Sequence, residues 1–182
     1  MKRLLLVDDE PGVLAALRRS LMDDPYEIAV AESGEEGLVQ LESFRPMVVI
    51  SDERMPGMDG SAFLAAVRER RPETVRIMLT GHASVDAAMR AVNGGEIYRF
   101  FTKPWDDLEL RLALRAAFEK YRLEEENRRL LATVRRQSQE LRGLERRFPG
   151  ITTVERDEQG AFLLPELSEE EIAAEIERCN AI

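Results

Sequence analysis

Short apolar runs that each end at a polar residue are the feature that most constrains the fold of this chain. The runs are LLLV at 4–7, MVVI at 47–50, IML at 77–79 and YRFF at 98–101, and helical patterns lie between them. Alternation of short apolar runs with helical stretches is typical of parallel strands joined by helical crossovers. The sequence therefore predicts an α/β fold built on a doubly wound parallel sheet.

Five strands and five helices are expected to alternate along the chain. The expected strands are residues 3–7, 27–31, 47–51, 75–79 and 97–101. The expected helices are residues 11–22, 34–43, 60–70 and 84–92, followed by a fifth that begins near 105. Five such units predict a flavodoxin-like sheet of strand order 2-1-3-4-5, in which the switch point lies between the first and third strands.

The polar residues at the ends of these runs are expected to meet at one edge of the sheet. They are Asp8, Asp9, Asp52, Thr80 and Lys103. Ligands of open α/β sheets bind beyond the carboxyl ends of the strands. Three acids gathered there without a cation would repel one another, and carboxylate oxygens are ligands that Mg²⁺ prefers. We therefore interpret the cluster as a site for a divalent metal and a phosphoryl group.

The motifs around these residues resemble the receiver domain of two-component response regulators. They are VDDEP at 7–11, SDERMPGMDG at 51–60, MLTGHA at 78–83 and FFTKPW at 100–105. All four occur in the order typical of the family, and the resemblance covers roughly residues 1–120 of the 182. It implies that a cognate histidine kinase transfers a phosphoryl group to Asp52.

The resemblance also implies a metal site and a set of residues that contact the metal. Asp9 and Asp52 would bind Mg²⁺ (or Mn²⁺) directly, Asp8 would act mostly through water, and the backbone carbonyl of Arg54 would complete the protein ligands. No other cofactor is expected.

Further roles follow from the same resemblance for the residues around the phosphoryl group. Asp52 would be the nucleophile, forming an acyl phosphate, while Lys103 would neutralise charge on the phosphoryl oxygens. Thr80 would donate its hydroxyl proton to a phosphoryl oxygen and move toward it. Phe100 would be the aromatic switch residue, at a position where tyrosine is common in the family. The Lys103–Pro104 peptide bond would be cis.

From residue 105 the helical pattern continues to residue 148, since no glycine occurs before Gly143 and no proline before Pro149. Apolar and amide residues recur along it with alternating steps of four and three. They are Leu123, Asn127, Leu130, Val134, Gln137, Leu141, Leu144 and Phe148. This is the heptad seam of a coiled coil. Asn127 at an a position favours a two-stranded coiled coil, and Gln137 at a d position weakens the packing between the two helices. We expect a parallel homodimer through residues 112–148; the alternative is a helix that folds back on its own domain.

Residues 149–182 form a separate tail in this interpretation. Residues 151–156 and 161–164 flank a turn-like DEQG, which indicates a β-hairpin, and Ser168 with Glu171 fits a helix capping box. The hairpin and short helix are too small for a core of their own. We expect the tail to pack on the same segment of the second chain, on the coiled coil or on a downstream protein partner.

Composition narrows the class of protein further. The tail has nine acidic and two basic residues, which is unfavourable for direct nucleic-acid binding. No apolar stretch is long enough to span a membrane, and no signal peptide is evident. One cysteine and one histidine exclude a structural zinc site and an internal disulfide, so we expect a cytoplasmic protein.

Two other functions stay open at this point. Residues 93–111 look like receivers that precede cyclic-dinucleotide phosphodiesterase or kinase domains, although the catalytic motifs of those enzymes do not occur in the sequence. A transcriptional regulator without its DNA-binding part is the second alternative, and the sequence has no P-loop. We expect no enzymatic activity other than self-phosphorylation and dephosphorylation at Asp52.

Overall fold

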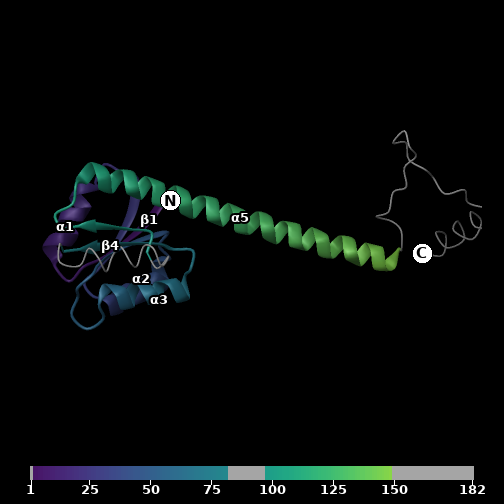
Figure 1. Cartoon of the computed structure of the whole chain (residues 1–182), viewed down its shortest axis with the longest axis horizontal. Coiled ribbons are helices and arrows are strands. Elements are labelled where there is room, and N and C mark those ends of the chain that lie inside the picture. Colours follow the sequence, from purple (N-terminus) through teal and green to yellow (C-terminus); the bar gives the residue numbers. More distant parts are fainter. Residues whose placement is uncertain (1, 82–96, 149–182) are drawn as a thin grey trace, which may run out of the picture. The chain divides into compact units, whose positions relative to one another are not determined.

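The computed structural model describes residues 2–81 and 97–148 of the chain. The described elements are β1 (Lys2–Val7), α1 (Pro11–Ser20), β2 (Tyr26–Ala31), α2 (Gly34–Phe44), β3 (Val48–Asp52), α3 (Gly60–Arg70), β4 (Val75–Thr80), β5 (Arg99–Thr102) and α5 (Asp107–Arg147) (Figure 1). The helix expected at 84–92 and the hairpin and helix expected in the tail lie outside the described residues.

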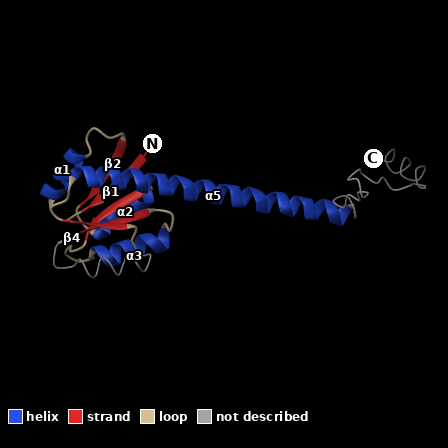
Figure 2. Cartoon of the chain, turned by 45° about the horizontal axis from the view of Figure 1, so that its top comes forward, coloured by secondary structure: helices blue, strands red, loops and turns tan. Residues whose placement is uncertain are grey.

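All five strands are parallel, in the order β2-β1-β3-β4-β5. Helices α1 and α5 pack on one face of the sheet, and α2 and α3 pack on the other (Figures 1 and 2). The doubly wound fold and its predicted strand order are confirmed.

The central strands contain continuous apolar runs because both of their faces are covered. Leu4 and Leu6 belong to the core beneath α1 and α5, whereas Leu5 and Val7 belong to the core beneath α2 and α3. Side chains alternate between the two faces of a strand, so the part of a strand that is covered on both sides is apolar at successive positions. The short apolar runs of the sequence are the direct result.

Element boundaries differ from expectation by a few residues. Strand β5 begins at Arg99 rather than at 97 and ends at Thr102, whose partner in the ladder is Thr80. Helix α5 begins at Asp107 rather than at 105 because Asp106 precedes it and accepts a hydrogen bond from the Glu109 N–H at 2.8 Å. Such a side-chain contact is typical of a helix N-cap.

Helix α5 is one uninterrupted helix of 41 residues (Figure 2). Its first turns are held against α1, where the Arg111 Nε donates to the Ser20 carbonyl at 2.7 Å and the Ser20 hydroxyl donates to Asp107 at 2.7 Å. Its buried residues are Leu110, Ala113, Leu114, Ala117 and Phe118. The continuous helix that the sequence predicts from 105 to 148 is therefore present.

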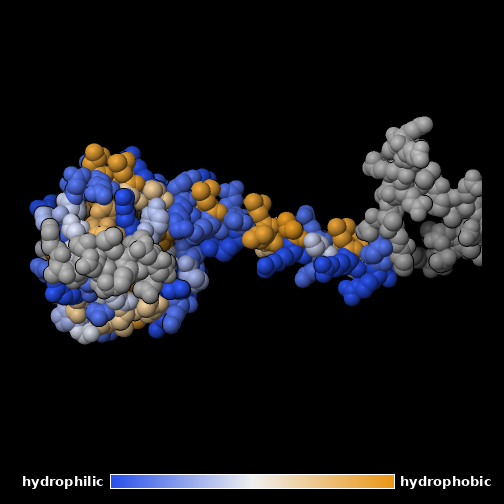
Figure 3. Space-filling view, viewed as in Figure 1, coloured by the Kyte–Doolittle hydropathy of each residue, from blue (hydrophilic) through white to orange (hydrophobic). Residues whose placement is uncertain are grey.

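The later part of α5 carries exposed apolar side chains. Those more than 40% exposed are Leu123, Leu130, Leu131, Val134, Leu141, Leu144 and Phe148. Figure 3 shows separate hydrophobic groups among hydrophilic neighbours along the visible face of this helix. Except for Leu131, these exposed residues belong to the predicted heptad seam. Within the described residues, no helix combines the length and the hydropathy that a membrane span requires.

Candidate functional site

The predicted site residues stand where neighbouring strands end. In the ladder Val7 pairs with Ser51, Asp52 with Leu79, and Thr80 with Thr102. Three backbone hydrogen bonds then extend the ladder beyond the strands: Asp8 N to Ala31 O at 3.1 Å, Glu53 N to Leu79 O at 2.9 Å, and Lys103 N to Thr80 O at 2.9 Å. The sheet therefore fixes the backbone on which these side chains are carried.

Lys103 joins two of the predicted acids. Its ammonium Nζ lies 2.7 Å from Asp8 Oδ2 and 2.5 Å from Asp52 Oδ1. Asp8 is fully buried and Asp52 is only 7% exposed, so both carboxylates lose most of their hydration and need a charged partner. The Lys103–Pro104 peptide bond that follows is cis, as the family resemblance implied.

The remaining carboxylate oxygens accept backbone hydrogen bonds. Asp8 Oδ1 accepts from the Glu10 N–H at 3.0 Å, and Asp52 Oδ2 accepts from the Arg54 N–H at 2.8 Å. Each carboxylate is thus held by one oxygen on the backbone and by the other on Lys103. This double anchoring fixes the orientation of both groups before any ligand binds.

Burial and mutual contact together shift the pKa values of Asp8 and Lys103. Burial raises the pKa of the Asp8 carboxyl, and the hydrogen bonds from Lys103 and from the Glu10 N–H oppose that rise. Burial acts to lower the pKa of Lys103, but its contacts with Asp52 and Asp8 outweigh that effect and raise the pKa. Lys103 therefore stays positively charged at neutral pH.

Asp9 and the Arg54 carbonyl complete the predicted metal ligands. Asp9 is half-exposed next to the buried Asp8, and Arg54 follows the loop end of β3. In the described part of the chain no three acidic side chains are close enough together to enclose a metal ion. Lys103 contacts both Asp8 and Asp52. The predicted donors are nonetheless all hard oxygens, which is the ligand chemistry that Mg²⁺ prefers.

Thr80 makes a contact that the sequence pattern did not indicate. Its side chain is fully buried, and its hydroxyl lies 2.6 Å from Glu53 Oε2 and 3.0 Å from the Gly81 carbonyl. Glu53 is separated from Thr80 by 27 residues in the sequence, and no periodicity links them. The only sequence signal was that Glu53 directly follows Asp52 at a strand end.

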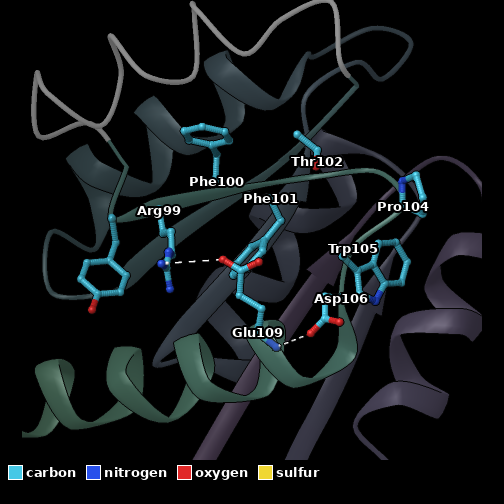
Figure 4. Close-up of a pocket in the computed structure, with 9 residues that line it drawn as sticks. Arg99, Phe100, Phe101, Thr102, Pro104, Trp105, Asp106 and Glu109 are labelled. Atoms are coloured by element: carbon cyan, nitrogen blue, oxygen red, sulfur yellow. Dashed lines mark hydrogen bonds and ion pairs between the residues drawn. The ribbon is translucent and has the colours of Figure 1, made fainter.

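Phe100 lies on the face of β5 opposite to Phe101. Figure 4 shows Phe101 directed toward α5 and Phe100 directed away from it. Phe100 is half-buried and packs against the core beneath α2 and α3. The structure thus gives Phe100 a packing role, and its role as a switch stays a prediction.

A pocket of about 670 Å³ lies between β5 and the start of α5, apart from the edge that carries Asp8, Asp52 and Lys103 (Figure 4). It is lined by Tyr98, Arg99, Phe100, Phe101, Thr102, Pro104, Trp105, Asp106 and Glu109. An ion pair between Arg99 and Glu109 at 3.8 Å crosses it. None of Asp8, Asp52 and Lys103 lines this pocket, so it belongs to the outer surface of β5 and α5 rather than to the predicted metal site.

Gly60 is required where the start of α3 meets the end of β3. A Cβ at this position would lie 1.9 Å from the Asp52 carbonyl oxygen. We expect Gly60→Ala to lower the free energy of unfolding by about 3 kcal/mol, since the contacting atoms are backbone atoms of Asp52 and Glu53 and cannot move aside as a flexible side chain can. Urea unfolding followed by circular dichroism measures this loss. The matched control is Gly12→Ala in α1, where no atom lies within 4 Å and a small gain is expected; equal stabilities of the two variants would contradict the prediction.

Comparison with known proteins identifies the family. The model of the response regulator receiver domain matches residues 4–115, which is more than half of the chain. Together with the parallel sheet and the acidic edge, this defines a phosphoacceptor domain of the two-component type. The chain belongs to the response regulator receiver domain family.

Individual relatives agree with this assignment. The transcriptional regulatory protein GlrR of Escherichia coli is 41% identical over 116 residues, which are 64% of this chain and 26% of that protein. The signal receiver domain of an HD domain-containing protein from Pseudomonas fluorescens is 41% identical with a TM-score of 0.64, covering 68% of this chain and 91% of that one. A structure described as adenylate cyclase from Rhodopirellula baltica is 36% identical with a TM-score of 0.69, covering 72% and 97%. The chain spans about a quarter of the length of the curated relatives that it matches.

Proposed function

We propose that the chain accepts a phosphoryl group on Asp52 and uses it to control a partner protein. The observation that carries this proposal is the arrangement of Asp52, whose carboxylate is paired with Lys103 beside the buried Asp8 at the carboxyl edge of the sheet. Relatives of this family are response regulators. The cognate donor is proposed to be a histidine kinase.

Three side chains divide the work of phosphoryl transfer in this proposal. A carboxylate oxygen of Asp52 forms the bond to phosphorus while the bond to the donor oxygen or nitrogen breaks, giving an acyl phosphate. Lys103, already positioned at 2.5 Å from Asp52, stays protonated and pairs with the phosphoryl oxygens. Thr80 donates its hydroxyl proton to one of them. Positioning and charge neutralisation account for most catalysis in phosphoryl transfer.

Receiver domains bind Mg²⁺ at the phosphorylation site, and four groups of this chain would hold it. They are the carboxylates of Asp8, Asp9 and Asp52 and the backbone carbonyl of Arg54. The metal supplies positive charge that stabilises the transferring phosphoryl group. The half-exposed Asp9 gives the ion an approach from solvent.

Removal of Lys103 is expected to strengthen binding of Mg²⁺. Lys103→Gln takes away the positive charge between Asp8 and Asp52, so we expect the affinity for Mg²⁺ to rise on the order of tenfold. Without metal, the variant should be less stable because a buried carboxylate has lost its partner. Isothermal titration calorimetry with MgCl₂ measures the first effect. Lys120→Gln, which removes a lysine that pairs with Glu124, is the control; equal affinities in both variants would contradict the metal assignment.

The direct test of the proposed function is labelling by acetyl phosphate with and without Mg²⁺, followed by intact-protein mass spectrometry. One phosphoryl adduct that requires Mg²⁺ is the expected result. Absence of any adduct under conditions in which the chain is folded would contradict the proposal.

The output is proposed to be transmitted by α5. Apolar side chains of the heptad seam are exposed along it, and the burial of such a stripe requires a partner helix. We infer a parallel homodimer through residues 112–148, with a downstream protein bound by the coil or by residues 149–182. Neither nucleic acid nor membrane is a direct partner in this proposal, and the compartment is the cytoplasm.

The two alternative functions are not favoured by the comparisons. These were the regulatory part of a cyclic-dinucleotide enzyme and a transcriptional regulator without its DNA-binding part. Receiver domains are regulatory, and we propose that the chemistry of this chain is confined to phosphorylation and dephosphorylation of Asp52.

A further inference from the structure

The hydroxyl of Thr80 has one proton to donate, and the structure directs it toward Glu53. A threonine hydroxyl is a single donor. Of its two acceptors, the Glu53 carboxylate at 2.6 Å is closer than the Gly81 carbonyl at 3.0 Å. Hydrogen bonds to an ionised carboxylate are also shorter and stronger than those to a neutral carbonyl. In the unphosphorylated chain, Glu53 is therefore the principal partner of Thr80.

The backbone of Glu53 is held in place on both sides. Its N–H donates to the Leu79 carbonyl at 2.9 Å, and its carbonyl accepts from the Gly60 N–H at 2.9 Å. Thr80 itself ends β4, where it pairs with Thr102. Two rigid strand ends thus bring the carboxylate and the hydroxyl together, so the contact is built into the sheet and is not an incidental surface contact.

Phosphoryl binding and the Glu53 contact need the same proton. In the proposed function, Thr80 donates to a phosphoryl oxygen on Asp52, and it cannot then donate to Glu53. Glu53 is half-exposed, so water can solvate its carboxylate once Thr80 turns away. The exchange is therefore reversible, and its free energy adds to the cost of reaching the phosphorylated arrangement.

We propose that Glu53 is a positioning residue that holds the Thr80 hydroxyl in the unphosphorylated state and competes with the phosphoryl group for it. This inference rests on the proposed function of Asp52. By linkage, any contact made only in the unliganded state weakens binding of a phosphoryl mimic. Loss of the Glu53 carboxylate therefore makes the mimic bind more tightly.

The test is a double-mutant cycle read by affinity for beryllofluoride in the presence of Mg²⁺, using the full chain. Glu53→Ala is expected to tighten binding about fivefold, which corresponds to the net contribution of a typical hydrogen bond. In the Thr80→Val background the same substitution is expected to change affinity by less than about twofold, since no hydroxyl remains to be released. Val is close to Thr in shape, so the background keeps the packing.

A charge control separates this role from simple repulsion of the anion. Glu10 lies near the same edge, because its backbone N–H donates to Asp8 Oδ1. Glu10→Ala therefore removes a carboxylate from this edge without removing a partner of Thr80. Glu53→Gln keeps an acceptor oxygen without charge. Its affinity for beryllofluoride is expected to lie between that of the parent chain and that of Glu53→Ala. Glu53→Gln also provides the measurement if Glu53→Ala does not fold.

Each outcome decides the inference. A gain that disappears in the Thr80→Val background supports it. An equal gain in both backgrounds, or a gain matched by Glu10→Ala, would show that Glu53 acts by charge alone and would overturn the inference, as would no gain at all. Failure of the parent chain to bind beryllofluoride would instead overturn the proposed function, so the two failures are distinguishable.

Discussion

Asp52→Asn is expected to abolish phosphorylation of the chain by acetyl phosphate. An amide oxygen is a poor nucleophile and forms no acyl phosphate, so the labelled fraction should fall by about a hundredfold or more, to background. Intact mass spectrometry after incubation with Mg²⁺ measures the fraction. The fold should persist, because Asn can still accept the hydrogen bond that the Arg54 N–H gives to Asp52.

Asp59→Asn is the matched control for this prediction. Asp59 lies in the loop between β3 and α3 and caps α3 by accepting from the Ala62 N–H at 2.7 Å, and Asn caps helices about as well as Asp does. Labelling should therefore be unchanged. Labelling of Asp52→Asn at the rate of the parent chain would place the nucleophile at another residue.

Leu130→Glu is expected to convert the proposed dimer into a monomer. Leu130 is 60% exposed in the single chain and lies at a d position of the seam. A carboxylate at such a position would be buried between helices without a partner, which costs several kcal/mol. A penalty of about 3 kcal/mol weakens association more than a hundredfold. Light-scattering mass at micromolar concentration should then correspond to one chain instead of two.

Ala132→Glu introduces the same side chain on the opposite side of α5. Ala132 is also exposed and lies two positions beyond Leu130, about 200° around the helix. The dimer is expected to persist in this control. A truncation after Tyr121 should likewise give the smaller species, and an unchanged dimer after truncation would show that the receiver domain holds the pair.

The same measurement with beryllofluoride and Mg²⁺ distinguishes two ways of signalling. A dimer with and without the mimic would mean that phosphorylation rearranges an existing coil. Coiled coils have discrete packing arrangements, so such a rearrangement can act as a two-state signal. A dimer formed only with the mimic would mean that phosphorylation controls assembly.

The sequence by itself determined the sheet and the edge at which the site lies. Runs such as 4–7 and 47–50 are apolar at every position because both faces of the strand are covered, and that pattern can be read locally. Asp8, Asp52 and Thr80 come at the ends of such runs. Since parallel strands end on the same side, the pattern also predicted that these residues would share an edge. The long helix after Trp105 was also predicted from a local feature, since the segment has no glycine before Gly143 and no proline before Pro149.

Only the tertiary structure decided which side chains at that edge contact one another. Lys103 bridges Asp8 and Asp52, although the family resemblance implied a contact of the lysine with the phosphoryl group and of the acids with the metal. Thr80 contacts Glu53, a residue to which the sequence analysis gave no role. Such contacts depend on ladder register and on side-chain rotamers, which bring together residues far apart in the chain. Local periodicity specifies neither the ladder register nor the rotamers, so only the folded sheet shows which side chains contact one another at the edge.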